Sequence, residues 1–271
     1  MKKVCVLGLF VSTLALADTT SVDWTNLTLK ATVSLRTTTA SDRPDVGEKF
    51  LTLLKATYFD ANQNVGDVLR FDFQKEAQLI PNLQDYRRVD ERYLTDGTQE
   101  VDYEITLPDR LLRLIQPKPE PIKLVVPMCC PTCGQVWPQN KRVPENTSLV
   151  GKEENVPSNY TSIVIDGRGT GLHPALFPRV KNDRGEEVYS KDFAQPEYVA
   201  ENGLVLYLND IQDIYTNPRI GYNPMRISAI GVSGRNKVDP VISQFDAAKI
   251  HGSKNMLDLL TKCRVIFVVG R

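Results

Sequence analysis

The sequence predicts an α+β protein of two small domains with mostly antiparallel sheets, joined by a proline-rich linker that carries a Cys-Pro-x-Cys-Gly knuckle. Three observations support this prediction. Apolar residues alternate along several short segments, as they do in half-buried strands, and recur at helical spacing in others. Turn-forming dipeptides separate neighbouring strand segments. Eight of the 17 prolines fall between Pro117 and Pro157, where both periodicities are lost.

An N-terminal domain is expected over residues 20–116. Its strands are predicted at 23–36, 65–73, 89–93 and 100–107, and its helices at 46–61 and 108–115. Asp96-Gly97 lies between the last two strands and favours a hairpin, because glycine tolerates the positive φ of a tight turn. Pro81 interrupts residues 75–88, and a proline inside a helix removes a hydrogen bond. We therefore expect only short helical turns in that segment.

A C-terminal domain is expected over residues 159–271. Its strands are predicted at 161–166, 176–181, 186–190, 204–208, 225–232, 238–243 and 263–269, and its helices at 210–215 and 255–262. Asp183-Arg184-Gly185 favours a hairpin between the second and third of these strands. The last strand is rich in β-branched residues, which suits the centre of a sheet. A linker over residues 117–158 joins this second α+β unit to the first.

The first 17 residues have the features of a secretory signal peptide. Lys2 and Lys3 precede an apolar run from Val4 to Leu14, and Ala15-Leu16-Ala17 is a small-x-small cleavage site. The run is too short to cross a bilayer, which takes about 20 apolar residues. We therefore expect cleavage after Ala17 and a protein exported to the periplasm or the cell surface.

Charge and hydropathy exclude several classes of partner. Removing residues 1–17 leaves 31 basic against 33 acidic residues. A chain so close to neutral is not held on nucleic acid or anionic lipid by bulk electrostatics. No later segment is apolar enough to predict a membrane span. In an oxidising compartment the remaining cysteines must be oxidised, bound to metal or buried.

Cys130 and Cys133 form the sequence feature with the clearest chemistry. Two thiolates separated by two residues can chelate one tetrahedral metal ion, and Gly134 lets backbone N–H groups turn towards the sulfur atoms. Zinc is the expected metal, but it needs four ligands and this motif supplies two. The others are expected from the same knuckle of a second subunit or from the remaining cysteines and histidines, namely Cys129, Cys263, His173 and His251.

A structural disulfide is the alternative for these cysteines. It would join Cys130 to Cys133 or form a bridge to Cys263, as is common in exported proteins. A redox-active Cys-Pro-x-Cys is disfavoured, because such a site needs its first cysteine at a helix N-terminus. Gly134 and Pro138 follow too closely for a helix to begin here. The sequence leaves the metal site and the disulfide both open.

No catalytic residues emerge from the sequence. Residues 166–171 place glycines after a strand, as nucleotide-binding turns do, but Pro174 and Pro178 exclude the long helix that would hold a phosphate. The two histidines have no partner at a triad or metalloprotease spacing. Ser233 lacks the glycine spacing of a nucleophile elbow. We therefore predict a protein that is not an enzyme and has no cofactor apart from the metal.

Several features of the two domains are shared with a known group of proteins. In the first domain, a strand, a helix ending in Asp60-Ala61, a short strand and the Asp96-Gly97 hairpin follow one another. In the second domain the likeness is carried by residues 160–171, 174–180, 229–234 and 263–268. In these features the chain resembles FlgT- and FlgP-like bacterial flagellar-assembly and envelope proteins. The resemblance implies a non-enzymatic envelope component of motility or of a surface assembly, built to contact other proteins.

Two functions are compatible with these patterns. The first is an exported scaffold or assembly protein of the cell envelope, stapled by a metal or a disulfide at the domain junction. Its partners would be envelope proteins or further copies of itself. The second is a periplasmic protein that handles metal or thiols through Cys129, Cys130 and Cys133. No lipidation cysteine stands at the cleavage site, which favours a soluble periplasmic protein over one anchored to the outer membrane.

Overall fold

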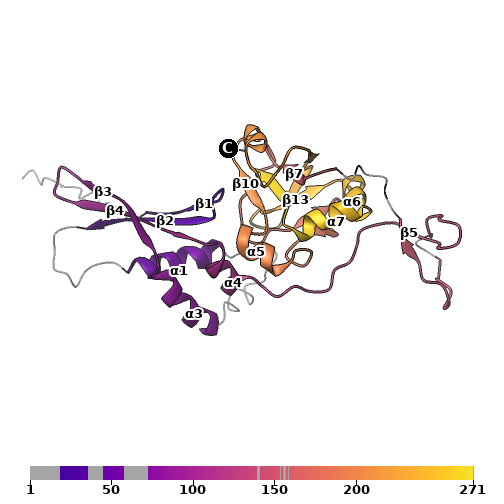
Figure 1. Ribbon diagram of the computed structural model, residues 1–271, viewed down its shortest axis with the longest axis horizontal. Helices are drawn as coiled ribbons and strands as arrows, with labels where there is room; N and C mark the ends of the chain where they lie inside the picture. Colours follow the sequence, from indigo (N-terminus) through magenta and orange to yellow (C-terminus); the bar gives the residue numbers. More distant parts are fainter. Residues whose placement is uncertain are drawn as a thin grey trace, which may run out of the picture.

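The chain is divided into an N-terminal unit, a long central arm and a C-terminal unit, as seen in the computed structural model (Figure 1). The structure describes residues 19–35, 45–57, 73–138, 141–152, 154, 157 and 159–270. The expected signal peptide at 1–17 and nearly all of the expected strand at 65–73 lie outside these residues. We use the term arm for residues 117–157, whose tip lies on the side of the C-terminal unit away from the N-terminal unit (Figure 1).

The N-terminal unit is built on a four-stranded antiparallel sheet in the order β1-β2-β4-β3. Its strands are β1 (Thr19–Asp23), β2 (Thr28–Leu35), β3 (Arg87–Tyr93) and β4 (Gln99–Thr106). The single strand predicted at 23–36 is wrong in its start, because a turn over residues 24–27 separates β1 from β2. The predicted hairpin between β3 and β4 is confirmed, with Gly97 at a φ of 81°.

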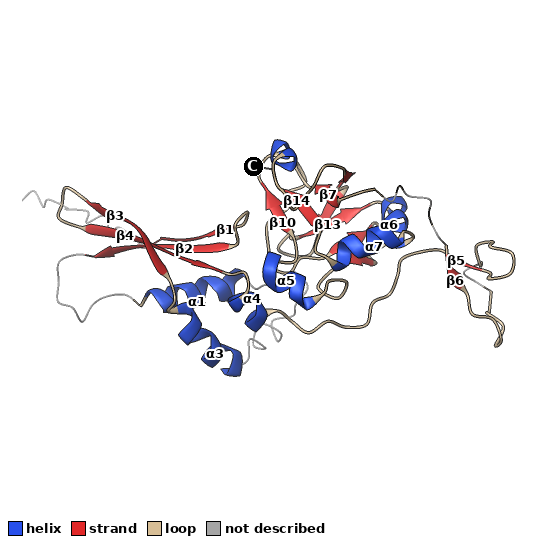
Figure 2. Cartoon of the chain, viewed as in Figure 1, coloured by secondary structure: helices blue, strands red, loops and turns tan. Residues whose placement is uncertain are grey.

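Helix α1 (Val46–Thr57) packs on this sheet, and α3 (Phe73–Leu83) packs against α1 and against α4 (Arg110–Ile115) (Figure 2). The prediction of only short helical turns around Pro81 was wrong, because α3 runs through that proline. Leu79 and Leu83 lie one turn apart on the buried face of α3, whereas Pro81 is exposed. Burial of these leucines offsets the hydrogen bond that the proline removes.

The main sheet of the C-terminal unit is parallel throughout, in the order β10-β14-β7-β11. Its strands are β7 (Ser162–Asp166), β10 (Leu206–Leu208), β11 (Pro224–Ser228) and β14 (Val265–Val268). The α+β class is therefore confirmed, with antiparallel pairing in the N-terminal unit and parallel pairing here. The parallel pairing of the main sheet follows from β7 and β14. The residues of these strands are buried on both faces, as is typical of parallel strands.

A second sheet of the C-terminal unit has the order β12-β13-β8-β9. Its strands are β8 (Val180–Asn182), β9 (Glu187–Tyr189), β12 (Gly231–Ser233) and β13 (Asp239–Ile242). The expected β8–β9 hairpin is confirmed, with Gly185 at a φ of 78° in its turn. The helices are α5 (Pro196–Asn202), the 3₁₀-helix η2 (Ile211–Tyr215), α6 (Gln244–His251) and α7 (Lys254–Thr261). The sequence prediction missed α5 and α6.

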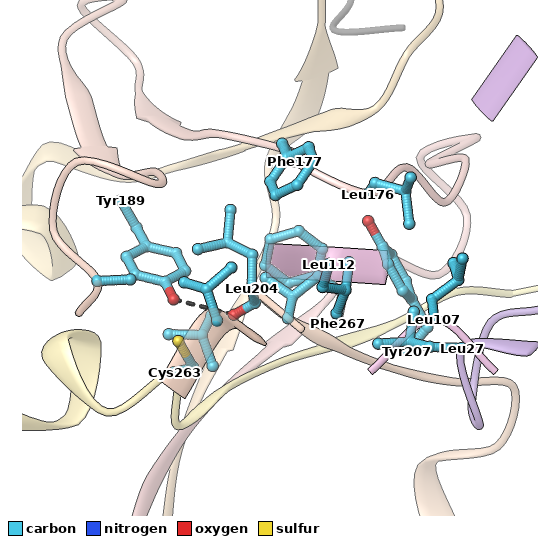
Figure 3. Packing of buried hydrophobic residues seen from close by; sticks show 14 of the residues in the cluster. Leu27, Leu107, Leu112, Leu176, Phe177, Tyr189, Leu204, Tyr207, Cys263 and Phe267 are labelled. Atoms are coloured by element: carbon cyan, nitrogen blue, oxygen red, sulfur yellow. Dashed lines mark hydrogen bonds between the residues drawn. The ribbon is translucent and has the colours of Figure 1, made fainter. Parts of the chain in front are cut away.

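The N-terminal and C-terminal units share one hydrophobic cluster (Figure 3). Leu27 and Leu107 of the first unit lie against Tyr207 of the second in this view. The ring of Trp24 meets that of Tyr207 edge to face, with 5.7 Å between centroids. The backbone N–H of Asp109, before α4, donates to the carbonyl of Ala200 in α5 at 2.6 Å. The two units are therefore packed directly together, although the arm separates them in sequence.

Candidate metal centre in the arm

Both ends of the arm are hydrogen bonded to the C-terminal unit. On the outgoing side, the Val125 N–H donates to Nδ1 of His251 at 2.7 Å. On the returning side, the Glu154 N–H donates to the carbonyl of Gly252 at 2.9 Å. The backbone N–H of Glu120 donates to a carboxylate oxygen of Asp192 at 2.6 Å. These contacts fix the base of the arm at α6 and beside β9.

His251 is the central residue of this anchor. Because its Nδ1 accepts from Val125, its Nε2 carries the proton and donates to the carbonyl of Val188 at 2.7 Å. The ring also stacks on Phe193, with 5.1 Å between centroids. Burial lowers the pKa of His251 below its usual value, so the neutral form is favoured. Sequence reasoning missed this role, because no local pattern links His251 to a segment 126 residues earlier.

The tip of the arm is a small sheet that presents the cysteines. Strand β5 (Met128–Cys129) pairs antiparallel with β6 (Val150–Gly151), and Cys129 also forms a bridge to Val136. The N–H of Trp137 donates to the carbonyl of Met128 at 2.7 Å. The chain after β5 therefore turns back on itself within a few residues. This reversal contains Cys130 and Cys133.

The knuckle turn, residues Cys130–Gly134, carries the two thiols of the Cys-x-x-Cys motif. The N–H of Gly134 donates to the carbonyl of Cys130 at 2.9 Å, and the N–H of Cys130 donates to the carbonyl of Gln135 at 2.9 Å. Gly134 has a φ of 69°, a conformation that glycine adopts without strain. Hydrogen bonding from the backbone N–H groups of Cys133 and Thr132 lowers the pKa of the Cys130 thiol. This is the arrangement in which a thiolate can bind a metal ion.

Cys129 is not part of that pair. It is only 4% exposed, and its cross-strand partners are Val136 and Val150. Successive side chains of a strand point to opposite faces, so the thiols of Cys129 and Cys130 point apart. Cys129 therefore packs as a small apolar residue between two valines.

Cys263 is likewise held away from the knuckle turn. It lies fully buried in the C-terminal core, in the same cluster as Tyr189 (Figure 3). Burial raises the pKa of the Cys263 thiol to about 11, which favours the protonated form that does not bind metal. All four cysteines in the described part of the chain are free thiols in this structure.

Neither histidine joins the cysteine pair. Both ring nitrogens of His251 are engaged, as described above. His173 is exposed, and its backbone N–H is bonded to the carbonyl of Lys237. Among the described residues, no three His, Cys, Asp or Glu side chains come together in a way that could hold a metal ion. Cys130 and Cys133 therefore have no third metal-binding side chain beside them among the described residues.

The glycine-rich loop after β7, residues 166–171, is closed by an ion pair between Arg168 and Asp166. Arg168 donates to both carboxylate oxygens of Asp166, at 2.9 and 2.6 Å. The Arg168 side chain, by this hydrogen bonding, lowers the pKa of Asp166. The chain next forms β8 rather than a helix, so the loop does not lead to a helix N-terminus that could hold phosphate.

An open groove of about 1120 Å³ is lined by the arm, by α6 and by the turn between β8 and β9. Its walls are mostly apolar side chains of the arm, with Phe245 and Ala248 of α6 opposite them. Ile122, Leu124 and Phe245 are 47%, 40% and 67% exposed. Contiguous exposed apolar surface of this kind is typical of contact sites on proteins.

The comparison with known protein families concerns the C-terminal unit. A family model for the second domain of Treponema pallidum Tp0624 matches residues 162–271. This similarity begins in β7 and covers the C-terminal unit, without the arm or the N-terminal unit. No curated protein matches the chain. Within the described residues, none of the helices has the length and apolar character needed to cross a membrane.

Proposed function

We propose that this chain is an exported, non-enzymatic scaffold or assembly protein of the bacterial cell envelope, associated with motility or a surface structure. The observation that carries the proposal is the exposed apolar surface formed by the arm and α6. A protein that binds others through such a surface gains free energy by removing it from water. The resemblance to FlgT- and FlgP-like envelope proteins supports the same role.

The packing of the rest of the chain suits a scaffold. The N-terminal and C-terminal units share a hydrophobic cluster, and the base of the arm is bonded to the C-terminal unit. A contact made at the arm is therefore held in a fixed relation to both units. Fixed geometry reduces the entropy that binding costs, which favours assembly.

The proposal is tested by photo-crosslinking in the living cell. A photoreactive residue at Leu124, in the groove, should form a discrete crosslink to an envelope protein or to a second copy of the chain. Phe245→Ser should weaken that crosslink, because it removes an exposed aromatic ring from the groove. Tyr222→Ser is the matched control, since Tyr222 is also an exposed aromatic residue, at 85%, but lies outside the groove. A chain that stays an uncrosslinked monomer, with motility and envelope intact after deletion of its gene, would contradict the proposal.

A second function, metal or thiol handling in the periplasm, is favoured by the knuckle turn. Cys130 is partly exposed and Cys133 is exposed, so an incoming metal ion or thiol can reach both. The double variant Cys130→Ser with Cys133→Ser separates the two functions. The site lies at the tip of the arm and not at the junction of the two units (Figure 1), so in a scaffold it would staple the arm alone, and the variant would lower the thermal stability of the arm. In a carrier, it keeps its stability and loses only metal or thiol exchange.

A further inference from the structure

The knuckle turn is a preformed half of a tetrahedral site. Cys130 is partly exposed and Cys133 is exposed, and the turn that carries them is closed by the hydrogen bonds from Gly134 to Cys130 and from Cys130 to Gln135. A structural zinc site is closed by four protein ligands. The described part of the chain offers no third ligand beside this pair. The remaining ligands of such a site would therefore lie outside the described residues of one chain.

The surroundings of the turn suit a second copy of the same surface. From Leu124 to Asn140 the sequence has no charged residue and no histidine, so this half of the tip brings no like charges together when two arms meet; Lys141, Arg142 and Lys152 lie on the returning half. Around the turn, Met128, Val136 and Val150 are 42–54% exposed on paired segments of the tip. Contact between two tips would remove these side chains from water.

We propose that two copies of the chain join at their arm tips around one zinc ion, with Cys130 and Cys133 of each copy as its four ligands. The arrangement is isologous, because the metal lies on a two-fold axis and each copy supplies the same pair. The site rests on the proposed scaffold function and deepens it, since it names a second copy as one partner. A site made only of thiolates favours zinc over magnesium, calcium and manganese, which bind mainly carboxylate, carbonyl and water oxygens.

Binding of zinc at this site releases protons and leaves a net negative charge on the centre. Four thiols each release a proton as they bind one Zn²⁺, so the centre carries two negative charges. Backbone N–H groups of a turn of this kind stabilise such a charge by hydrogen bonding to the sulfur atoms. Zinc binding and dimer formation are thus one equilibrium, in which each promotes the other.

The test is a titration of the reduced, purified protein with Co²⁺ as a spectroscopic stand-in for zinc, followed by native mass spectrometry with Zn²⁺. Absorbance should break at about half an equivalent of Co²⁺ per chain, with thiolate-to-cobalt charge transfer of the intensity given by four sulfurs. The mass spectrum should contain a dimer with one zinc, which a chelator converts to monomers. Cys130→Ser and Cys133→Ser should each abolish both signals.

Cys129→Ala is the matched control, because it removes the adjacent thiol and leaves the knuckle turn in place. It should keep the half-equivalent break and the zinc-containing dimer. A break at one equivalent per chain with a monomeric zinc form would overturn the proposal, since the site would then be completed within one chain. Reduced protein that takes up no metal, or a dimer unaffected by chelator, would also overturn it.

The outcomes separate this inference from the scaffold function. If zinc dimers do not form but the Leu124 crosslinks to envelope proteins persist, the zinc site alone is wrong. If zinc dimers form while crosslinks in the cell are absent and deletion has no effect, the scaffold function is wrong and the metal site stands as a separate property.

Discussion

Gly203→Ala tests whether the two units form one body. Gly203 ends α5 with φ 74° and ψ 161°, a region that is essentially restricted to glycine. A Cβ at this position would overlap Cδ1 of Leu27, which belongs to the N-terminal unit. We expect backbone strain to cost about 1–3 kcal/mol. Overlap with the packed leucine adds about 1–3 kcal/mol, so the free energy of unfolding should fall by about 2–6 kcal/mol.

A double-mutant cycle with Leu27→Ala isolates the contact between the units. Leu27 is buried, so its truncation alone should cost about 2–5 kcal/mol. In the Leu27→Ala background the overlap is gone, and Gly203→Ala should cost only its backbone strain. The coupling energy should therefore be about 1–3 kcal/mol.

Urea unfolding of the full chain provides the assay, followed by circular dichroism and by tryptophan fluorescence. Trp24 reports on the junction, because its ring meets Tyr207. Gly185→Ala is the control: Gly185 also has a positive φ, of 78°, but a Cβ there would meet no atom within 4 Å. It should cost strain alone and add independently to Leu27→Ala. Additive costs for Gly203→Ala and Leu27→Ala, or separate transitions for the two units, would refute the shared core.

Three other predictions concern buried or reactive groups. Burial lowers the pKa of His251 in the folded chain. Below about pH 6.5 the unfolded chain therefore binds more protons than the folded chain. The free energy of unfolding should fall as the pH drops from 7 to 5. Urea titrations at several pH values measure this slope, and a free energy of unfolding that rises as the pH drops would contradict the burial of His251. Tyr207→Phe should lower the free energy of unfolding by about 1–3 kcal/mol, as measured by thermal unfolding, because the buried N–H and C=O of Ala175 both lose their bond to the Tyr207 hydroxyl. An unchanged free energy of unfolding would contradict these hydrogen bonds. Iodoacetamide should modify Cys130 of the native, metal-free protein within minutes and spare Cys263 until unfolding, as read by peptide mass spectrometry; equal rates would contradict the assigned burial.

Local turn chemistry was the part of the structure that the sequence predicted best. The Asp96-Gly97 hairpin and the Asp183–Gly185 hairpin each form where glycine permits a positive φ. The knuckle turn is of the same kind, because Gly134 after Cys133 lets the chain reverse. In each case the deciding interactions lie within a few residues, so a short stretch of sequence determines the outcome.

Long-range packing was the part that local patterns could not predict. Residues 204–208 and 263–269 read as strands, but their parallel pairing depends on which distant segment lies beside them. Pro81 argued against a helix, yet packing of Leu79 and Leu83 outweighed it. The pair Cys130 and Cys133 was identified from its spacing, whereas the burial of Cys263 and the anchoring by His251 became visible only in three dimensions.

X-ray absorption at the zinc edge tests the two-copy knuckle most directly, and the Cys129→Ala variant makes it decisive. After residue 17 that variant keeps three thiols per chain, so four sulfurs around one zinc require two chains. We predict a single shell of four sulfur atoms at about 2.3 Å from the metal. A shell that contains nitrogen or oxygen at about 2.0–2.1 Å would contradict the account, because histidine, carboxylate or water would then complete the site.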